Sequence, residues 1–293
     1  MDTVIDIQNV SKSFGRHQAV ADLSLSIPQG SIYALLGDNG AGKTTTIRML
    51  TGLLQPDAGS LTILEKDCWK QAVKLRHLVG YVPERPRFYD WMSIHEIGWF
   101  TSGFHTNGYL HRYQELIDQF GLDQSARLSR LSKGQYAKVG LSLALAGDPQ
   151  VLILDEPTSG LDLLVRREFL TSMVEMAAEG RTIVISSHQI AEVERIASHV
   201  AFMANGRLLL HGTMEEARRR LIRLSFRGDV PREMLGEVGT VLETKNLGRE
   251  WQVSILDPKR DAIEKVRGRG GVEEFEELPL SLEDAYCALL SEK

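Results

Sequence analysis

One glycine-rich segment has the residue types and spacing of an anion-binding loop. Residues Gly37-Asp38-Asn39-Gly40-Ala41-Gly42-Lys43-Thr44 fit the pattern G-x-x-x-x-G-K-[ST]. The glycines let consecutive backbone N–H groups turn toward one anion, and a helix that starts after the loop adds the positive end of its dipole. Lys43 would neutralise β- and γ-phosphate oxygens, and the Thr44 hydroxyl would ligate Mg²⁺. The segment therefore predicts a site for a phosphate chain with its metal ion.

Two carboxylates follow an apolar run farther along the chain. Residues 151–154 have the composition of a buried strand, and Asp155 and Glu156 come directly after them. A carboxylate at that point can hold Mg²⁺ directly or through water, and Glu156 stands where a general base is wanted. Alone, the two residues could equally be solvated acids at the end of a strand. Together with the phosphate loop they predict the second half of one site.

The elements around both segments are predicted to be those of an α/β sheet. An apolar run predicts a buried strand over 31–36, and the apolar spacing after the loop predicts a helix over 44–53. Strands are also expected at 151–154 and 182–186, with a helix at 163–178 between them. This order predicts a right-handed parallel crossover.

A mostly helical pattern covers residues 87–146, which predicts an inserted helical subdomain. Its aromatic-rich stretch 88–104 has two possible uses, packing in a core and docking a helix of a membrane partner.

The last part of the chain, residues 222–293, predicts a small α+β module. Strands are expected at 222–226, 240–244 and 251–256, with a helix near 258–267 and a terminal helix to about 291. Capping-box patterns are formed by Thr213 with Glu216 and by Ser281 with Asp284. Four arginines, at 218, 219, 220 and 223, are either cations at a helix C-terminus or a patch for an anionic ligand.

Composition narrows the class of protein. A chain of 293 residues is long enough for about two domains, and 43% hydrophobic with 25% charged residues is typical of a globular protein. The net charge of −5 argues against nonspecific binding of nucleic acid. No apolar run reaches the roughly 18 residues of a membrane span. Cys68 and Cys287 have no metal-site spacing, and no signal-peptide pattern begins the sequence, so we expect an intracellular, cytoplasmic protein.

Further motifs make the sequence resemble one family. Leu131-Ser132-Lys133-Gly134-Gln135 resembles the Leu-Ser-Gly-Gly-Gln signature of ATP-binding cassette (ABC) transporter ATPases. The other family features occur in the expected order along the chain. Phe14 resembles the aromatic residue that stacks on adenine, and Tyr81-Val82-Pro83-Glu84 resembles the loop that normally carries Gln. Ser159-Gly160-Leu161-Asp162 resembles the D-loop, and His188 resembles the switch histidine. The resemblance covers about residues 1–220. By themselves, Phe14 would be an ordinary packed aromatic and His188 a histidine at a strand end.

The resemblance implies a fold and a domain division. The fold is the α/β P-loop NTPase fold of ABC ATPases, with a mixed sheet core, an antiparallel β subdomain and an inserted helical subdomain. The ATPase domain would span residues 1–221, and residues 222–293 would form the C-terminal accessory α+β module.

The resemblance also implies ATP and Mg²⁺ as cofactors, bound between two subunits that pack head to tail. In that arrangement Ser132 and the Gly134 amide would contact the γ-phosphate held by the partner, and Thr45 would reach the α-phosphate. Glu156 would polarise the attacking water while His188 steadies it. Asp162 would carry the state of one site to the other.

Two positions depart from the family pattern. Glu84 replaces the usual Gln, so a charged side chain would approach Mg²⁺ as a ligand or through water. This resembles the branch whose partners are ABC-2 type membrane subunits, mostly exporters. Lys133 replaces the first signature glycine and would be strained if its backbone needed a positive φ, so we expect reduced but not absent activity.

The resemblance implies a function with named partners. The chain would power a separate integral membrane permease, of the ABC-2 export type, as a peripheral protein on the inner face of the membrane. Its second ATPase subunit would be a further copy or a different chain. The alternative is a soluble ABC ATPase that acts on nucleic acid or the ribosome, against which the acidic charge argues. The C-terminal module would stabilise the dimer or, alternatively, sense a ligand.

Overall fold

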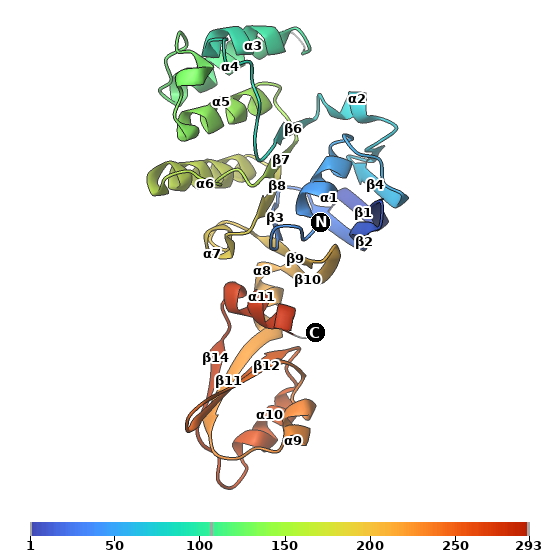
Figure 1. The fold of residues 1–293 in the computed structure, drawn as a ribbon, viewed down its shortest axis with the longest axis vertical. Helices are drawn as coiled ribbons and strands as arrows, with labels where there is room; N and C mark the ends of the chain where they lie inside the picture. Colours follow the sequence, from blue (N-terminus) through green and yellow to red (C-terminus); the bar gives the residue numbers. More distant parts are fainter. Residues whose placement is uncertain (1, 106–107, 292–293) are drawn as a thin grey trace. The chain divides into compact units, whose positions relative to one another are not determined.

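The computed structural model describes residues 2–105 and 108–291, which form two compact units. The first unit contains the residues up to Gln189 together with Ile196–Leu208, and the second contains Ile190–Arg195 and the residues from Leu209 onward. Figure 1 shows the elements of both units, coloured along the sequence from blue at the N-terminus to red at the C-terminus. Within the described residues, no helix combines the length and apolar character needed to cross a bilayer.

A parallel sheet forms the centre of the first unit. Its strands are β3 (Ile32–Leu36), β6 (Val79–Val82), β7 (Val151–Asp155), β8 (Thr182–Ser187) and β9 (His199–Ala204), in the order β9-β3-β8-β7-β6. These strands pair in parallel, and the residues of β3, β7 and β8 are buried throughout. Strands covered on both faces have such continuous apolar runs, so their positions were predictable from composition.

Helices connect these strands. Helix α6 (Leu163–Ala178) joins β7 to β8 over the residues predicted for it. Helix α1 (Lys43–Leu50) follows the glycine-rich loop and ends earlier than predicted. Its continuation to residue 53 is wrong because Gly52 has φ +66°, and a Cβ at that position would lie 2.5 Å from the Cys68 carbonyl oxygen. A left-handed glycine directly after a helix ends it.

An antiparallel sheet lies in the same unit and shares a core with α1. It has the order β2-β1-β4-β5 and consists of β1 (Thr3–Phe14), β2 (His17–Pro28), β4 (Ala58–Ile63) and β5 (Lys66–Asp67). The short helix α2 (Ala72–Leu75) follows it. The expected α/β architecture with an antiparallel β subdomain is confirmed.

The inserted helical region has its own hydrophobic core. It contains α3 (Ile94–Ser102), α4 (Tyr109–Gln119), the 3₁₀ turn η1 (Leu128–Arg130) and α5 (Lys133–Leu145). Ile94, Tyr113, Ile117 and Val139 are buried in that core, whereas five aromatic side chains of the same region remain exposed. The exposed ones are Tyr89, Trp91, Trp99, Phe100 and Phe104.

The second unit is a split β-α-β-β-α-β arrangement with added helices. Its elements are α7 (Ile190–Val193), the end of β10 (Arg207–Thr213), α8 (Met214–Arg220), β11 (Leu221–Arg227), α9 (Arg232–Glu237), β12 (Thr240–Leu247), β13 (Glu250–Leu256), α10 (Arg260–Arg267), β14 (Glu273–Pro279) and α11 (Leu282–Ser291). Its sheet is antiparallel with the order β12-β13-β11-β14, and α9 and α10 share one core with it. The capping box of Thr213 and Glu216 is present. At Ser281 the hydroxyl accepts from the Asp284 N–H at 3.1 Å.

The four arginines at 218–223 are ion-paired within the second unit. Their guanidinium groups lie 2.6–3.7 Å from the carboxylates of Glu194, Glu215, Asp257 and Asp284. The Arg220 hydrogen bonds hold the pKa of Asp257 below its usual value. These contacts favour the structural interpretation of the arginines over a patch for an anionic ligand.

Candidate active site at the ends of the parallel strands

The glycine-rich loop lies between β3 and α1, where the sequence places it. Gly42 precedes α1 with φ +104°, and a Cβ there would stand 2.6 Å from the Ala19 carbonyl oxygen. A side chain is therefore excluded both by the backbone conformation and by the neighbouring strand. This close packing fixes the start of α1, from which Lys43, Thr44 and Thr45 project as its first three residues.

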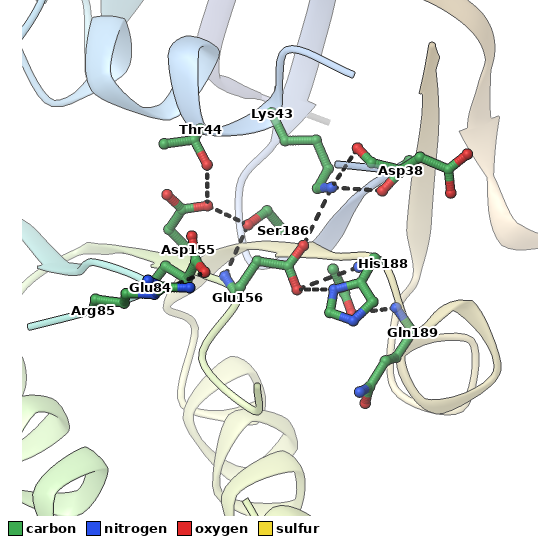
Figure 2. A network of polar contacts seen from close by, with 12 residues as sticks. Asp38, Lys43, Thr44, Glu84, Arg85, Asp155, Glu156, Ser186, His188 and Gln189 are labelled. Carbon is green, nitrogen blue, oxygen red and sulfur yellow. Dashed lines mark hydrogen bonds and ion pairs between the residues drawn. The ribbon is translucent and has the colours of Figure 1, made fainter. Parts of the chain in front are cut away.

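Lys43 lies inside the loop and faces an acid from another strand. Its side chain is only 5% exposed, and Nζ donates hydrogen bonds to the carbonyl oxygens of Gly37, at 2.5 Å, and Asp38, at 3.2 Å. Nζ also lies 3.2 Å from Oε1 of Glu156 (Figure 2). A buried ammonium held in this way is a fixed positive charge at the mouth of the loop.

Glu156 is held by its backbone as well as by its carboxylate. It follows β7 with φ +48°, a left-handed conformation that L residues rarely adopt. Its N–H donates to the hydroxyl of Ser186 at 2.9 Å and to the carbonyl of Ser186 at 3.2 Å. Oε1 is buried and has no hydrogen-bond partner among the described residues, although Lys43 Nζ is close. The Lys43 ammonium is thus the charged group that faces Oε1 of Glu156.

His188 contacts the other oxygen of Glu156. Its Nδ1 lies 2.7 Å from Oε2, and its backbone N–H donates to the same oxygen at 3.3 Å. A carboxylate can only accept, so Nδ1 carries the proton in this contact. The imidazole is 39% exposed, with Nε2 as its second polar atom. Lys43, Glu156 and His188 thus form one buried-to-exposed chain of polar contacts.

Asp155 is hydrogen-bonded both to the start of α1 and to strand β8. Its Oδ1 accepts hydrogen bonds from the hydroxyls of Thr44, at 3.1 Å, and Ser186, at 2.6 Å. Burial raises the pKa of Asp155 above its usual value, the two hydroxyl hydrogen bonds act in the opposite direction, and the nearby charges of Glu156 and Glu84 raise it further. A carboxylate with a raised pKa inside a site gains from a neighbouring cation.

The donor set fits a magnesium ion with a phosphate chain. Thr44 and Asp155 bring a hydroxyl and a carboxylate oxygen together, which are oxygen ligands of the kind Mg²⁺ takes. Within residues 2–105 and 108–291, no three His, Cys, Asp or Glu side chains gather as a metal cage. Mg²⁺ commonly takes its remaining ligands from substrate phosphates and water. The Lys43 ammonium and the backbone of the loop fit the phosphate part.

One pocket collects most of the residues predicted for the nucleotide. It is lined by Phe14, by the loop and helix start from Asp38 to Thr45, by Glu84 and by Glu156. Phe14 is 51% exposed and is not packed in a core, and the Lys12 ammonium lies 5.8 Å from the centre of its ring. Asn39, Gly40 and Ala41 are among the loop residues that line the pocket. Glu84 is half-exposed, and its Oε1 lies 3.5 Å from the Arg85 guanidinium.

The signature residues do not join this pocket. Ser132 caps α5, where its hydroxyl accepts from the Gln135 N–H at 3.2 Å and the Gln135 side chain accepts from the Ser132 N–H at 2.9 Å. Leu131 and Lys133 line a second pocket, together with Glu84 and residues of the D-loop. The strain expected for a positive φ at Lys133 does not arise, because this residue opens the helix. Gly134 lies on the same first turn, facing Val165.

Asp162 begins the helix after the D-loop. Its Oδ1 accepts hydrogen bonds from the N–H groups of Leu164 and Val165, each at 3.1 Å. The next two side chains, Leu163 and Leu164, are more than 70% exposed. The start of α6 therefore presents apolar side chains next to a capping carboxylate.

Sequence reasoning missed Ser186 as a residue of the site. It contacts Asp155 and Glu156, yet its position as the fifth residue of an apolar strand gives no sign of this. The register of the sheet reveals this contact, because Ser186 of β8 is paired with Asp155 of β7. A register between strands 31 positions apart has no local trace in the sequence.

Comparisons with known proteins agree with this site. Residues 20–159 match the family described as ABC transporter. An uncharacterized ABC transporter ATP-binding protein, YxlF of Bacillus subtilis (strain 168), is 31% identical over 98% of this chain and 99% of its own length. The Nod factor export ATP-binding protein I of Rhizobium etli is 30% identical over 98% of this chain and 93% of its own.

Two further relatives cover less of the chain. The bacitracin transport ATP-binding protein BcrA of Bacillus licheniformis is 35% identical over 71% of this chain and 69% of its own. A solved structure of an ATP binding subunit of an ABC transporter is similar with a TM-score of 0.68 and 30% identity, over 74% of this chain and 92% of that one.

Proposed function

Since the chain belongs to the family of ABC transporter ATP-binding proteins and is an ATPase of that family, we propose that it powers a separate membrane permease of the ABC-2 export type. Two copies would close around two ATP molecules, each held between the loop of one copy and the signature of the other. Both halves of such a site are present in this chain, so a second copy suffices as partner. No nucleic-acid partner is proposed.

The observation that carries the hydrolytic part is the contact chain from Lys43 through Glu156 to His188. Lys43 Nζ stands 3.2 Å from one carboxylate oxygen and His188 Nδ1 stands 2.7 Å from the other. His188 would thereby orient the carboxylate, which would accept a proton from the attacking water. Glu156 lines the same pocket as the loop, which supports this role beside the phosphate-binding groups.

The remaining residues would bind and orient. Thr44 and Asp155 would hold Mg²⁺, which supplies neutralisation of phosphate charge when bound. Glu84 lines the same pocket and would approach the metal or its water. The Phe14 ring would stack on the base, the Thr45 hydroxyl would contact the α-phosphate, and the Lys43 ammonium would hold the β- and γ-phosphate oxygens. Ser132, Gly134 and Asp162 would act across the dimer.

The name of one relative, a Nod factor export protein, supports the export direction, and that of another, a bacitracin transport protein, supports transport. The permease would place this chain on the inner face of the membrane. We propose residues 1–221 as the ATPase domain and 222–293 as an accessory module that stabilises the dimer. The exposed aromatic side chains of 88–104 would contact a cytoplasmic helix of the permease.

The variant Glu156→Gln tests the proposed function. It removes the base and keeps the shape of the side chain, so turnover should fall by about two to four orders of magnitude while ATP still binds. Phosphate release is the measurement, and copurification of a polytopic membrane protein with the wild-type chain tests the partner. Unchanged turnover would reject Glu156 as the base, and capture of ribosomes or nucleic acid in place of a membrane protein would reject the transport function.

A further inference from the structure

The hydroxyl of Ser186 makes two hydrogen bonds of opposite sense inside the site. It donates to Oδ1 of Asp155 at 2.6 Å and accepts from the N–H of Glu156 at 2.9 Å (Figure 2). The residue is fully buried. One atom therefore joins the carboxylate proposed for the metal to the backbone of the residue proposed as base.

The sheet register explains why one side chain reaches both acids. Asp155 is the last residue of β7 and is paired with Ser186 of the neighbouring parallel strand β8. Glu156 lies just beyond the end of β7 with a left-handed backbone, and its N–H points to the Ser186 hydroxyl. A hydroxyl on the neighbouring strand can bond to the side chain of the first acid and the main chain of the second.

The backbone of Glu156 needs such support. Its φ of +48° lies in the left-handed region, which persists in an L residue only where the surroundings hold it. The N–H of Glu156 is bonded to the hydroxyl and the carbonyl of Ser186, and no other hydrogen-bond acceptor takes this N–H among the described residues. One of the two hydrogen bonds of this N–H is thus made to a side chain, which a mutation can remove.

We propose that Ser186 is a positioning residue that aligns the metal-binding carboxylate and the catalytic base as one unit. This inference rests on the proposed function and adds a residue to it. These two contacts require a group at position 186 that both donates and accepts a hydrogen bond. A hydroxyl does both, whereas a methyl group does neither. Ser186 acts through Asp155 and Glu156, to which its hydroxyl is hydrogen-bonded.

The variant Ser186→Ala removes both hydrogen bonds and leaves the volume nearly unchanged. A lost hydrogen bond to a charged group corresponds to about a tenfold to hundredfold fall in kcat, with KM for ATP changed by no more than about twofold. A second readout needs no turnover. Binding of a fluorescent ATP analogue should require several-fold more Mg²⁺ for half saturation, while binding of the analogue without metal stays as in the wild type.

Two variants complete the experiment. Ser186→Thr keeps the hydroxyl and should restore most of kcat and the Mg²⁺ dependence. Ser142→Ala is the matched control, since Ser142 is equally buried and its hydroxyl donates to the Lys138 carbonyl oxygen at 2.9 Å, away from the site. Its kcat and Mg²⁺ dependence should stay at wild-type values.

The inference is overturned if Ser186→Ala keeps the wild-type kcat and Mg²⁺ dependence, or if it loses no more than Ser142→Ala. The Mg²⁺ titration of the alanine variant decides this even where the threonine variant does not fold. A wild-type chain that fails to hydrolyse ATP would instead reject the proposed function, so the two failures are distinct.

Discussion

The phosphate loop and the signature motif are both at helix starts, but their polar groups are used differently. Around the loop, Lys43 contacts Glu156 and Thr44 contacts Asp155, so two distant segments meet there, and Lys43 and both acids are almost fully buried. At the signature, Ser132 and Gln135 are hydrogen-bonded to each other and remain exposed. The first set is an assembled site, whereas the second is a capped helix end to which no side chain from another segment of residues 2–105 and 108–291 is hydrogen-bonded.

This difference shows that a single chain assembles the half of the site around the phosphate loop but not the half that contains the signature motif. Distant segments converge at the ends of parallel strands because the register of the sheet brings them together, as Asp155 and Ser186 show. The signature turn faces a different pocket, lined by the D-loop. The signature residues lie outside the nucleotide pocket of their own chain, and the family resemblance therefore leads us to propose that they act on a second copy.

The change Lys43→Ala should break the assembled half and have the largest effect on binding. It removes the buried ammonium that faces Glu156 and the loop carbonyls, so ATP affinity should fall by more than about tenfold. Isothermal titration with Mg-ATP measures this. Unchanged affinity would show that the loop backbone alone holds the phosphates and would contradict the role given to the ammonium.

Much of this assembled half could be predicted from the sequence, because glycine spacing and apolar runs are local signals. The strands around 31–36, 151–154 and 182–186 and the helix 163–178 are present at those places. The early end of α1 depends on the contact between Gly52 and Cys68, which lie far apart in sequence. Strand β14 carries four glutamates in seven residues, so its composition predicts no strand, and its pairing with β11 supplies what propensity does not.

The change Ser132→Ala should affect the signature half more weakly and in a different quantity. ATP affinity measured on single chains should stay within about twofold, while turnover falls by about tenfold, because the hydroxyl would act only on the nucleotide of a second copy. Loss of the helix cap costs about 1 kcal/mol of stability. The readouts are phosphate release and thermal unfolding.

The matched control for that loss is Ser93→Ala. Ser93 forms the same kind of capping box with Glu96 at the start of α3. It should lose a similar amount of stability and keep full turnover. If both variants lost turnover equally, the effect at Ser132 would come from the helix cap, and the signature role would be wrong.

The most direct test of the central claim is to mix two variants that are each impaired in ATP hydrolysis. In a dimer of Lys43→Ala with Ser132→Ala, one site carries both defects and the other carries none if the loop and the signature act across two copies. An equimolar mixture should then recover about one quarter of wild-type ATPase activity, since about half of the dimers are mixed and each has one intact site. A mixture that is no more active than the mean of the separate variants would show that both motifs serve the same chain and would contradict the account.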